Sequence, residues 1–231
     1  MSENIEQSAA QTAPATNLYD AQAEQKYTFT ADEDLEITHI YKPLSDERFF
    51  EFDRNSRLKL VDDGTNVISD NAKALGDLFD DQIIDVLGFE GEKPENWKAE
   101  LDIDRDKIPS VSFLLTVSAF SEAKRGWGQA EGVSTEAWFN GKVTRQKHFL
   151  RKKTAEDVRD FRKFQKIPIA SKAKGLVSGE TVIPSNAKGK ADLYDRMMSQ
   201  PATGYAGSIV PAWHKAAVID HLFSSGLTAK K

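Results

Sequence analysis

The sequence has no cysteine among its 231 residues, and it has only four histidines. The absence of cysteine excludes disulfide bonds, thiolate nucleophiles and cysteine-ligated metal sites. There is also no apolar run near the roughly 18 residues that a membrane-spanning helix needs, and the first residues lack the basic-then-apolar pattern of a signal peptide. We therefore expect a protein of the cytoplasm with no membrane contact, metal or cofactor.

Apolar and aromatic residues are nevertheless abundant, at 39% and 10% of the chain, which is enough to build hydrophobic cores. The N-terminal segment differs, because it is rich in Gln, Ala, Thr, Ser and Glu and has few large apolar groups. Such a composition buries too little apolar surface to offset the entropy lost on ordering. We expect residues 1–26 to form a disordered tail, in which NLYDAQ (residues 17–22) is the one candidate interaction motif.

From Tyr27 onward, the chain reads as two copies of one unit. Residues 27–54 and 136–163 correspond at a constant offset of 109 residues, and alternating apolar and polar positions predict a β-hairpin in each. In the second copy, Asn140-Gly141 is a typical two-residue hairpin turn. A match at a fixed offset predicts an internal repeat.

A helix start follows each hairpin. Ser45 and Thr154 stand at matching positions, and the acidic residues after each of them suit the first turn of a helix. Phe52 and Phe161 also match, and their spacing from the preceding apolar residues indicates one buried stripe. We therefore expect these two phenylalanines to occupy equivalent buried positions.

The correspondence continues in looser register. Residues 78–91, LFDDQIIDVLGFEG, match residues 193–207, LYDRMMSQPATGYAG, and residues 107–122 match residues 208–225. Taken alone, VSFLLTVSAF (residues 111–120) resembles a buried strand. The matching residues 208–225, however, have the pattern of a helix that begins after a proline. We therefore expect a helix in both copies.

These patterns predict an α+β fold of two tandem related modules, each a β-hairpin followed by about three helices. The acidic module covers residues 27–125, and the basic module covers residues 133–226. Residues 126–132, with the sequence GWGQAEG from Gly126, form the linker between them. A short C-terminal tail follows at residues 227–231.

The stretch VPAWHKAAVIDHLFSSG, from Val210, is the first place in the chain that looks like chemistry. His214 and His221 lie two helical turns apart, whereas a helix that binds zinc offers its ligands at i and i+4. We therefore expect both at the solvent edge of a packing helix. His39 and His148 fall at equivalent strand positions, where a structural hydrogen bond is the expected role. No residue set identifies a reaction, and we expect a protein without enzymatic activity.

The two halves differ in charge. Residues 27–131 carry a net charge of −12, and residues 132–231 carry a net charge of +10. This separation is compatible with docking of the halves within one chain, with head-to-tail association between copies, or with nucleic acid contact by the basic half. Nucleic acid is the least expected of these, because basic stripes are usually solvated. The candidate partner-binding residues are basic or aromatic: Arg151, Lys152, Lys153, Lys172, Lys174 and Trp213.

The segments YKPLSDERFFEF, LRKKTAEDVRDFRK, DLYDRM and VPAWHKAAVIDHLF together resemble small accessory proteins encoded among the tail genes of tailed bacteriophages, in particular the tail-assembly chaperones. The resemblance implies a non-enzymatic protein made in the cytoplasm of the infected bacterium. It also implies partners among the phage tail proteins, such as the tape-measure protein or the tail tube. A virion component, such as a connector or tail protein, is the alternative within the same setting.

Overall fold

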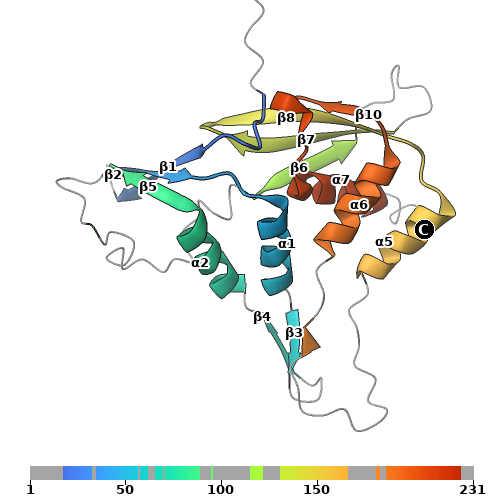
Figure 1. Cartoon of the computed structure of the whole chain (residues 1–231), viewed down its shortest axis with the longest axis horizontal. Coiled ribbons are helices and arrows are strands. Elements are labelled where there is room, and N and C mark those ends of the chain that lie inside the picture. Colours follow the sequence, from blue (N-terminus) through green and yellow to red (C-terminus); the bar gives the residue numbers. More distant parts are fainter. Residues whose placement is uncertain are drawn as a thin grey trace, which may run out of the picture.

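The computed structural model describes residues 18–32, 35–56, 58–61, 66–69, 71–88, 95, 115–121, 131–165, 181–182 and 186–224. Over these residues the chain has an α+β fold with five α-helices and two main antiparallel sheets, one of three strands and one of four (Figure 1). The expected fold class is therefore confirmed. Within the described ranges, no helix is both long and apolar enough to cross a membrane.

The three-stranded sheet is built from the N-terminal half. Strands β1 (Gln25–Asp32) and β2 (Leu35–Tyr41) form the expected antiparallel hairpin. Helix α1 (Asp46–Asn55) follows, and α2 (Asn71–Gln82) runs directly into strand β5 (Ile83–Leu87). Strand β5 pairs antiparallel with β2, which gives the sheet order β1-β2-β5.

A first hydrophobic core lies between this sheet and α2. Alternation along β2 directs Ile37 and Tyr41 to the same face of the sheet, where Leu78 and Phe79 of α2 cover them. Phe52 of α1 is half-buried at the margin of this core. The expectation that Phe52 is buried is therefore met only in part.

The four-stranded sheet has the order β10-β8-β7-β6. Its strands are β6 (Val117–Ser121), β7 (Glu131–Phe139), β8 (Lys142–Leu150) and β10 (Met198–Thr203). All neighbouring pairs are antiparallel, and β7 and β8 pair over their whole length.

The turn between β7 and β8 is the predicted Asn140-Gly141 pair. Both residues have positive φ, 47° for Asn140 and 79° for Gly141, as a type I′ hairpin turn requires. The side-chain oxygen of Asn140 also accepts a 2.8 Å hydrogen bond from the backbone N–H of Lys26. The hairpin tip is thus attached to the start of β1 in the other sheet.

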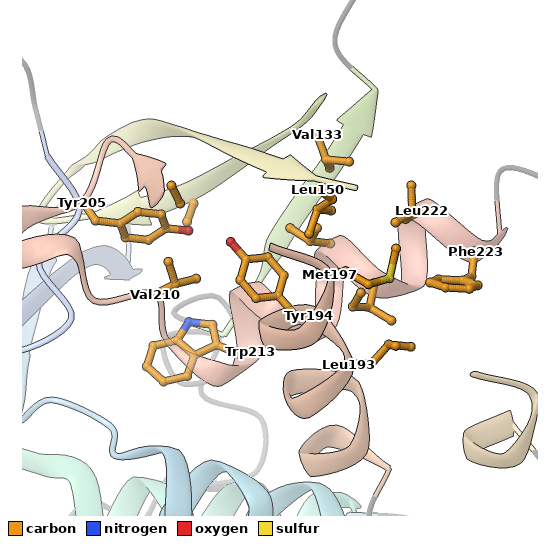
Figure 2. Close-up of a cluster of buried hydrophobic side chains, with 14 of the residues drawn as sticks. Val133, Leu150, Leu193, Tyr194, Met197, Tyr205, Val210, Trp213, Leu222 and Phe223 are labelled. Atoms are coloured by element: carbon orange, nitrogen blue, oxygen red, sulfur yellow. The ribbon is translucent and has the colours of Figure 1, made fainter. Parts of the chain in front are cut away.

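Helix α7 (Ala212–Ser224) packs against this sheet, α6 (Ala187–Met197) packs against α7, and α5 (Ala155–Gln165) packs on the outer side of α6 (Figure 1). A short 3₁₀ turn, Ala206–Ser208, precedes α7. Figure 2 shows the second core, in which aliphatic and aromatic side chains of the sheet meet those of the helices. Phe161 is buried there as expected and stacks on Phe223 with ring centroids 4.6 Å apart.

A small third sheet joins distant parts of the chain. Strand β3 (Leu58–Val61) pairs with β4 (Asn66–Ser69) on one side and with β9 (Thr181–Val182) on the other. Since β9 belongs to the second half of the chain, this sheet connects the segment after α1 with the segment between α5 and α6.

One expected helix is a strand. Residues 117–121, which we expected to be helical, form β6 at the edge of the four-stranded sheet. In the extended conformation, Val117 and Ala119 both point toward the second core, while the backbone satisfies its hydrogen bonds along β7. The first part of the expected helix, residues 107–114, lies outside the described residues.

The predicted disordered tail, residues 1–26, includes residues that belong to the fold. Tyr19 is fully buried in the second core, and its backbone N–H donates to the carbonyl of Gly204 at 2.9 Å. Residues 18–26 are therefore part of the fold, because an aromatic side chain among them reaches a distant apolar site. Similarly, Glu131 and Gly132 belong to β7 and not to the linker. Residues 1–17, 122–130 and 225–231 lie outside the described residues.

Candidate functional site

The basic segment that follows β8 contains most of the candidate partner-binding residues, but its first residue has an internal role. The guanidinium of Arg151 donates to both carboxylate oxygens of Asp157, at 2.6 and 2.9 Å. Asp157 also accepts from the backbone N–H of Thr154 at 2.8 Å, and the Thr154 hydroxyl caps the helix by accepting from the Asp157 N–H. Arg151 holds the pKa of Asp157 far below its usual value. Arg151 thus fixes the turn from β8 into α5.

Two further candidates also face inward. The ammonium of Lys153 donates to the carbonyl of Leu222 at 2.7 Å, in the last turn of α7, and lies 5.4 Å from the centre of the Phe223 ring. Trp213 is only 5% exposed, and its ring contacts that of Phe49 in α1 with centroids 5.9 Å apart. Neither side chain is placed to bind an external partner. Lys172 and Lys174 lie outside the described residues.

Three exposed cations remain in this region, one just before α5 and two on the helix. Lys152, Arg159 and Arg162 are exposed, and none of the ion pairs formed among the described residues includes them. We call these three residues the basic stripe. Sequence analysis selected Lys152 but missed the two arginines. A signal was present, because residues at i and i+3 on the polar face of a helix are neighbours, and Thr154 marks the start of that helix.

The N-terminal half carries a matching feature of opposite charge. Asp77 and Asp80 are both exposed on α2 and are also three residues apart. We call them the acidic stripe. The next carboxylate, Asp81, is already bound by Arg48 at 2.9 Å and by Lys42 at 3.2 Å. In Figure 1, α2 and α5 lie on opposite sides of the molecule, with α1 and α6 between them.

Helix α1 forms the junction between the two halves. Its Asp46 carboxylate accepts from the backbone N–H of Ala212 at 2.8 Å, at the start of α7. Two turns later, Asp53 accepts from the N–H of Ala187 at 3.1 Å, at the start of α6. Carboxylates at helix N-termini satisfy unpaired backbone donors and interact favourably with the helix dipole. One face of α1 therefore caps two helices of the other half, and Phe49 packs between these contacts.

A buried polar network runs through the second core. His148 is bonded through Nδ1 to the hydroxyl of Tyr194 at 2.8 Å and through Nε2 to that of Tyr205 at 3.2 Å. The Tyr205 hydroxyl also contacts Nδ1 of His214 at 2.8 Å. Burial lowers the pKa of His148 to about 4 and that of His214 well below its usual value. These imidazoles are neutral structural groups.

Two expectations about histidine are settled by this geometry. His214 is fully buried, so its expected place at the solvent edge is wrong. The Tyr205 hydroxyl, nine residues away, gives its Nδ1 a hydrogen-bond partner inside the core. The expected structural role of His148 is confirmed, and His39 is likewise buried with its Nδ1 3.1 Å from the Tyr41 hydroxyl. His221 is half-buried and bonds Ser121 at 3.0 Å.

Within the described part of the chain, no group of three or more histidine and acidic side chains is placed to hold a metal ion. Comparisons with protein-family models, with curated proteins and with solved structures each find no match. The candidate site is therefore defined by geometry alone: an exposed basic stripe on α5 and an exposed acidic stripe on α2.

Proposed function

We propose that the chain consists of two related modules. Support comes from the order of elements, which is β1-β2-α1-β3-β4-α2-β5 in the first half and β7-β8-α5-β9-α6-β10 in the second. Both contain a hairpin, a helix, a second helix and a returning strand, with the strands of the small third sheet between the two helices. In each half the last strand pairs with the second strand of the hairpin. The backbone N–H of Lys42 donates to Gln82, and that of Arg151 donates to Met197, at the matching junctions.

Two glycines add independent support. Gly88 and Gly204 end the returning strands, with φ of 102° and 90°. A Cβ at Gly88 would overlap the carbonyl oxygen of Glu36, and one at Gly204 would overlap that of Arg145. Glu36 and Arg145 are themselves separated by the same offset of 109 residues as the hairpins. The same left-handed turn against the same strand position is a detail that unrelated hairpins rarely share.

From this arrangement we infer a non-enzymatic assembly factor that binds other proteins. The observation that carries the inference is the pair of exposed helix faces of opposite charge, one on each module. Such faces steer and orient protein partners. Combined with the resemblance to tail-assembly chaperones, this makes phage tail proteins, either the tape-measure protein or the tail tube, the proposed partners in the host cytoplasm.

The test is capture of tail proteins by the full chain from infected host cells. We expect the tape-measure or tail-tube protein to be captured by the wild type and lost by the double variant Arg159→Glu, Arg162→Glu. The matched control is Lys142→Glu, an exposed lysine at the hairpin tip, which leaves capture intact. Capture of nucleic acid alone, abolished by nuclease or by salt, would refute the proposal in favour of a nucleic-acid-binding protein.

A further inference from the structure

A small cavity, partly open to solvent, lies where the two halves of the chain meet. Its walls come from the start of β1, the end of β2, helix α2 and helix α7, and Leu44 in its wall packs against both hydrophobic cores. The wall is mainly apolar and includes Leu78 and Trp213. The cavity volume is about 30 Å³, whereas a single water molecule needs roughly 10–15 Å³. A group of a few non-hydrogen atoms therefore fits.

Gln82 provides a polar group that the fold holds in this wall. It is the last residue of α2, its side chain is buried, and its backbone carbonyl accepts from the N–H of Lys42 at 3.0 Å. Its side-chain Nε2 donates to the carboxylate of Asp81 at 2.8 Å. Because the reversed amide would place an oxygen against that carboxylate, Asp81 fixes which end of the amide is left for another partner.

The remaining end is an acceptor. Oε1 of Gln82 is buried and accepts no hydrogen bond from the described residues. A buried acceptor without a donor is unfavourable, so a donor brought into the cavity gains more there than it would at an exposed carbonyl. Lys42 also lines the cavity, but its ammonium binds Asp81 at 3.2 Å. The polar requirement of the site is therefore a neutral donor for Gln82.

We propose that this cavity is a binding site for a small neutral molecule that is mostly apolar and carries one hydrogen-bond donor, of which a short-chain alcohol is the simplest case. Its hydrocarbon part contacts the apolar wall, and its hydroxyl donates to Oε1 of Gln82. Since the walls come from both halves, an occupied site also favours the joined state of the fold by mass action. The inference does not rest on the proposed assembly function.

The test is an NMR titration of the full chain with 2-propanol and, separately, with acetone. The two molecules have similar shape and the same number of non-hydrogen atoms, but acetone has no donor. We expect saturable shifts of the Trp213 indole and Gln82 amide signals, with 2-propanol bound about fivefold more tightly than acetone, as one neutral hydrogen bond provides.

Three variants assign the effect to the cavity. Gln82→Met keeps the length of the side chain and removes the acceptor, so the preference for 2-propanol over acetone should disappear. Gln200→Met, at an exposed glutamine of β10, is the matched control and retains the preference. Leu44→Trp fills part of the cavity and should weaken binding of both molecules. Thermal melting checks that each variant is folded.

Shifts that rise linearly with both molecules and never saturate would overturn the inference, because they report a general solvent effect. Equal affinity of the wild type for 2-propanol and acetone overturns it too, as does a preference that Gln82→Met leaves unchanged. A chain that binds 2-propanol as expected but captures no tail protein counts against the proposed function alone, so failure of the two proposals is distinguishable.

Discussion

Lowering the pH from about 7.5 to about 5 is expected to destabilise the folded protein, and the buried imidazoles set the size of the effect. Burial lowers the pKa of His39 and of His148 to about 4, against about 6.5 in an unfolded chain. Between these values the unfolded state binds protons that the folded state does not. Stability is therefore fully present above pH 6.5 and declines as the pH falls toward 4.

The magnitude follows from the two pKa values. At pH 5 each histidine is mostly protonated in the unfolded chain and mostly neutral in the fold, which amounts to about 2 kcal/mol per residue, or about 4 kcal/mol together. His214 acts in the same direction, since burial also lowers its pKa. The salt-bridged Asp157 has a lowered pKa, so its contribution is lost only as the pH falls below the ordinary range of a carboxyl group. The interval from pH 7.5 to 5 therefore reports on the histidines.

Urea denaturation followed by tryptophan fluorescence at the two pH values measures the difference. A protein of this size has roughly 5–15 kcal/mol of stability, so a loss of about 4 kcal/mol moves the midpoint visibly. In the His39→Gln variant, the difference in unfolding free energy between the two pH values should shrink by about 2 kcal/mol, and any cost of the substitution that does not depend on pH cancels. Equal free energies of unfolding at pH 7.5 and 5 would refute the reasoning.

Three other predictions concern stability and use the same denaturation assay. Asp46→Ala removes the cap on α7 and is expected to lower the free energy of unfolding by about 1 kcal/mol. Glu47→Ala, at the exposed neighbouring residue, is the control and should have little effect. Equal losses would contradict the capping role. Gly141→Ala is expected to lower the free energy of unfolding by roughly 1 kcal/mol, and Gly204→Ala by several times as much. Both glycines have positive φ, but only at Gly204 would a Cβ meet a carbonyl oxygen. Similar losses for the two variants would contradict that close approach. Tyr19→Ala should cost about 3–5 kcal/mol, as for a buried aromatic residue, and a neutral result would place residue 19 outside the core.

Local signals account for the parts of the fold that sequence analysis predicted. The hairpin turn at Asn140 and the caps at Ser45 and Thr154 depend on residues within a few positions of each other, and all three are confirmed. Strand β6 was missed because an apolar run has the same pattern in a buried helix and in a buried strand. Only pairing with β7, whose position the local pattern does not encode, decides between them.

The candidate site was predicted less well, for a related reason. Charge and sequence clustering selected Arg151 and Lys153, but both are used inside the fold. Arg151 binds Asp157, six residues away, and Lys153 binds the carbonyl of Leu222, 69 residues away. Composition averaged over a window also concealed Tyr19, a single aromatic residue in a polar segment. Which side chains are exposed depends on how the helix packs. Arg159 and Arg162 could therefore be identified as surface residues only from the structure, which shows the face of α5 that is buried.

The contact of Tyr19 with Gly204 has a consequence for synthesis. Tyr19 is synthesised long before its partner Gly204, and Asp46 long before the α7 N-terminus that it caps. At about 5–20 residues per second, translation separates these partners by roughly ten seconds or more. During that interval the nascent chain exposes an unsatisfied aromatic anchor and an uncovered face of α1. The contacts that join the N-terminal segments to the second half therefore form only after α7 has been synthesised.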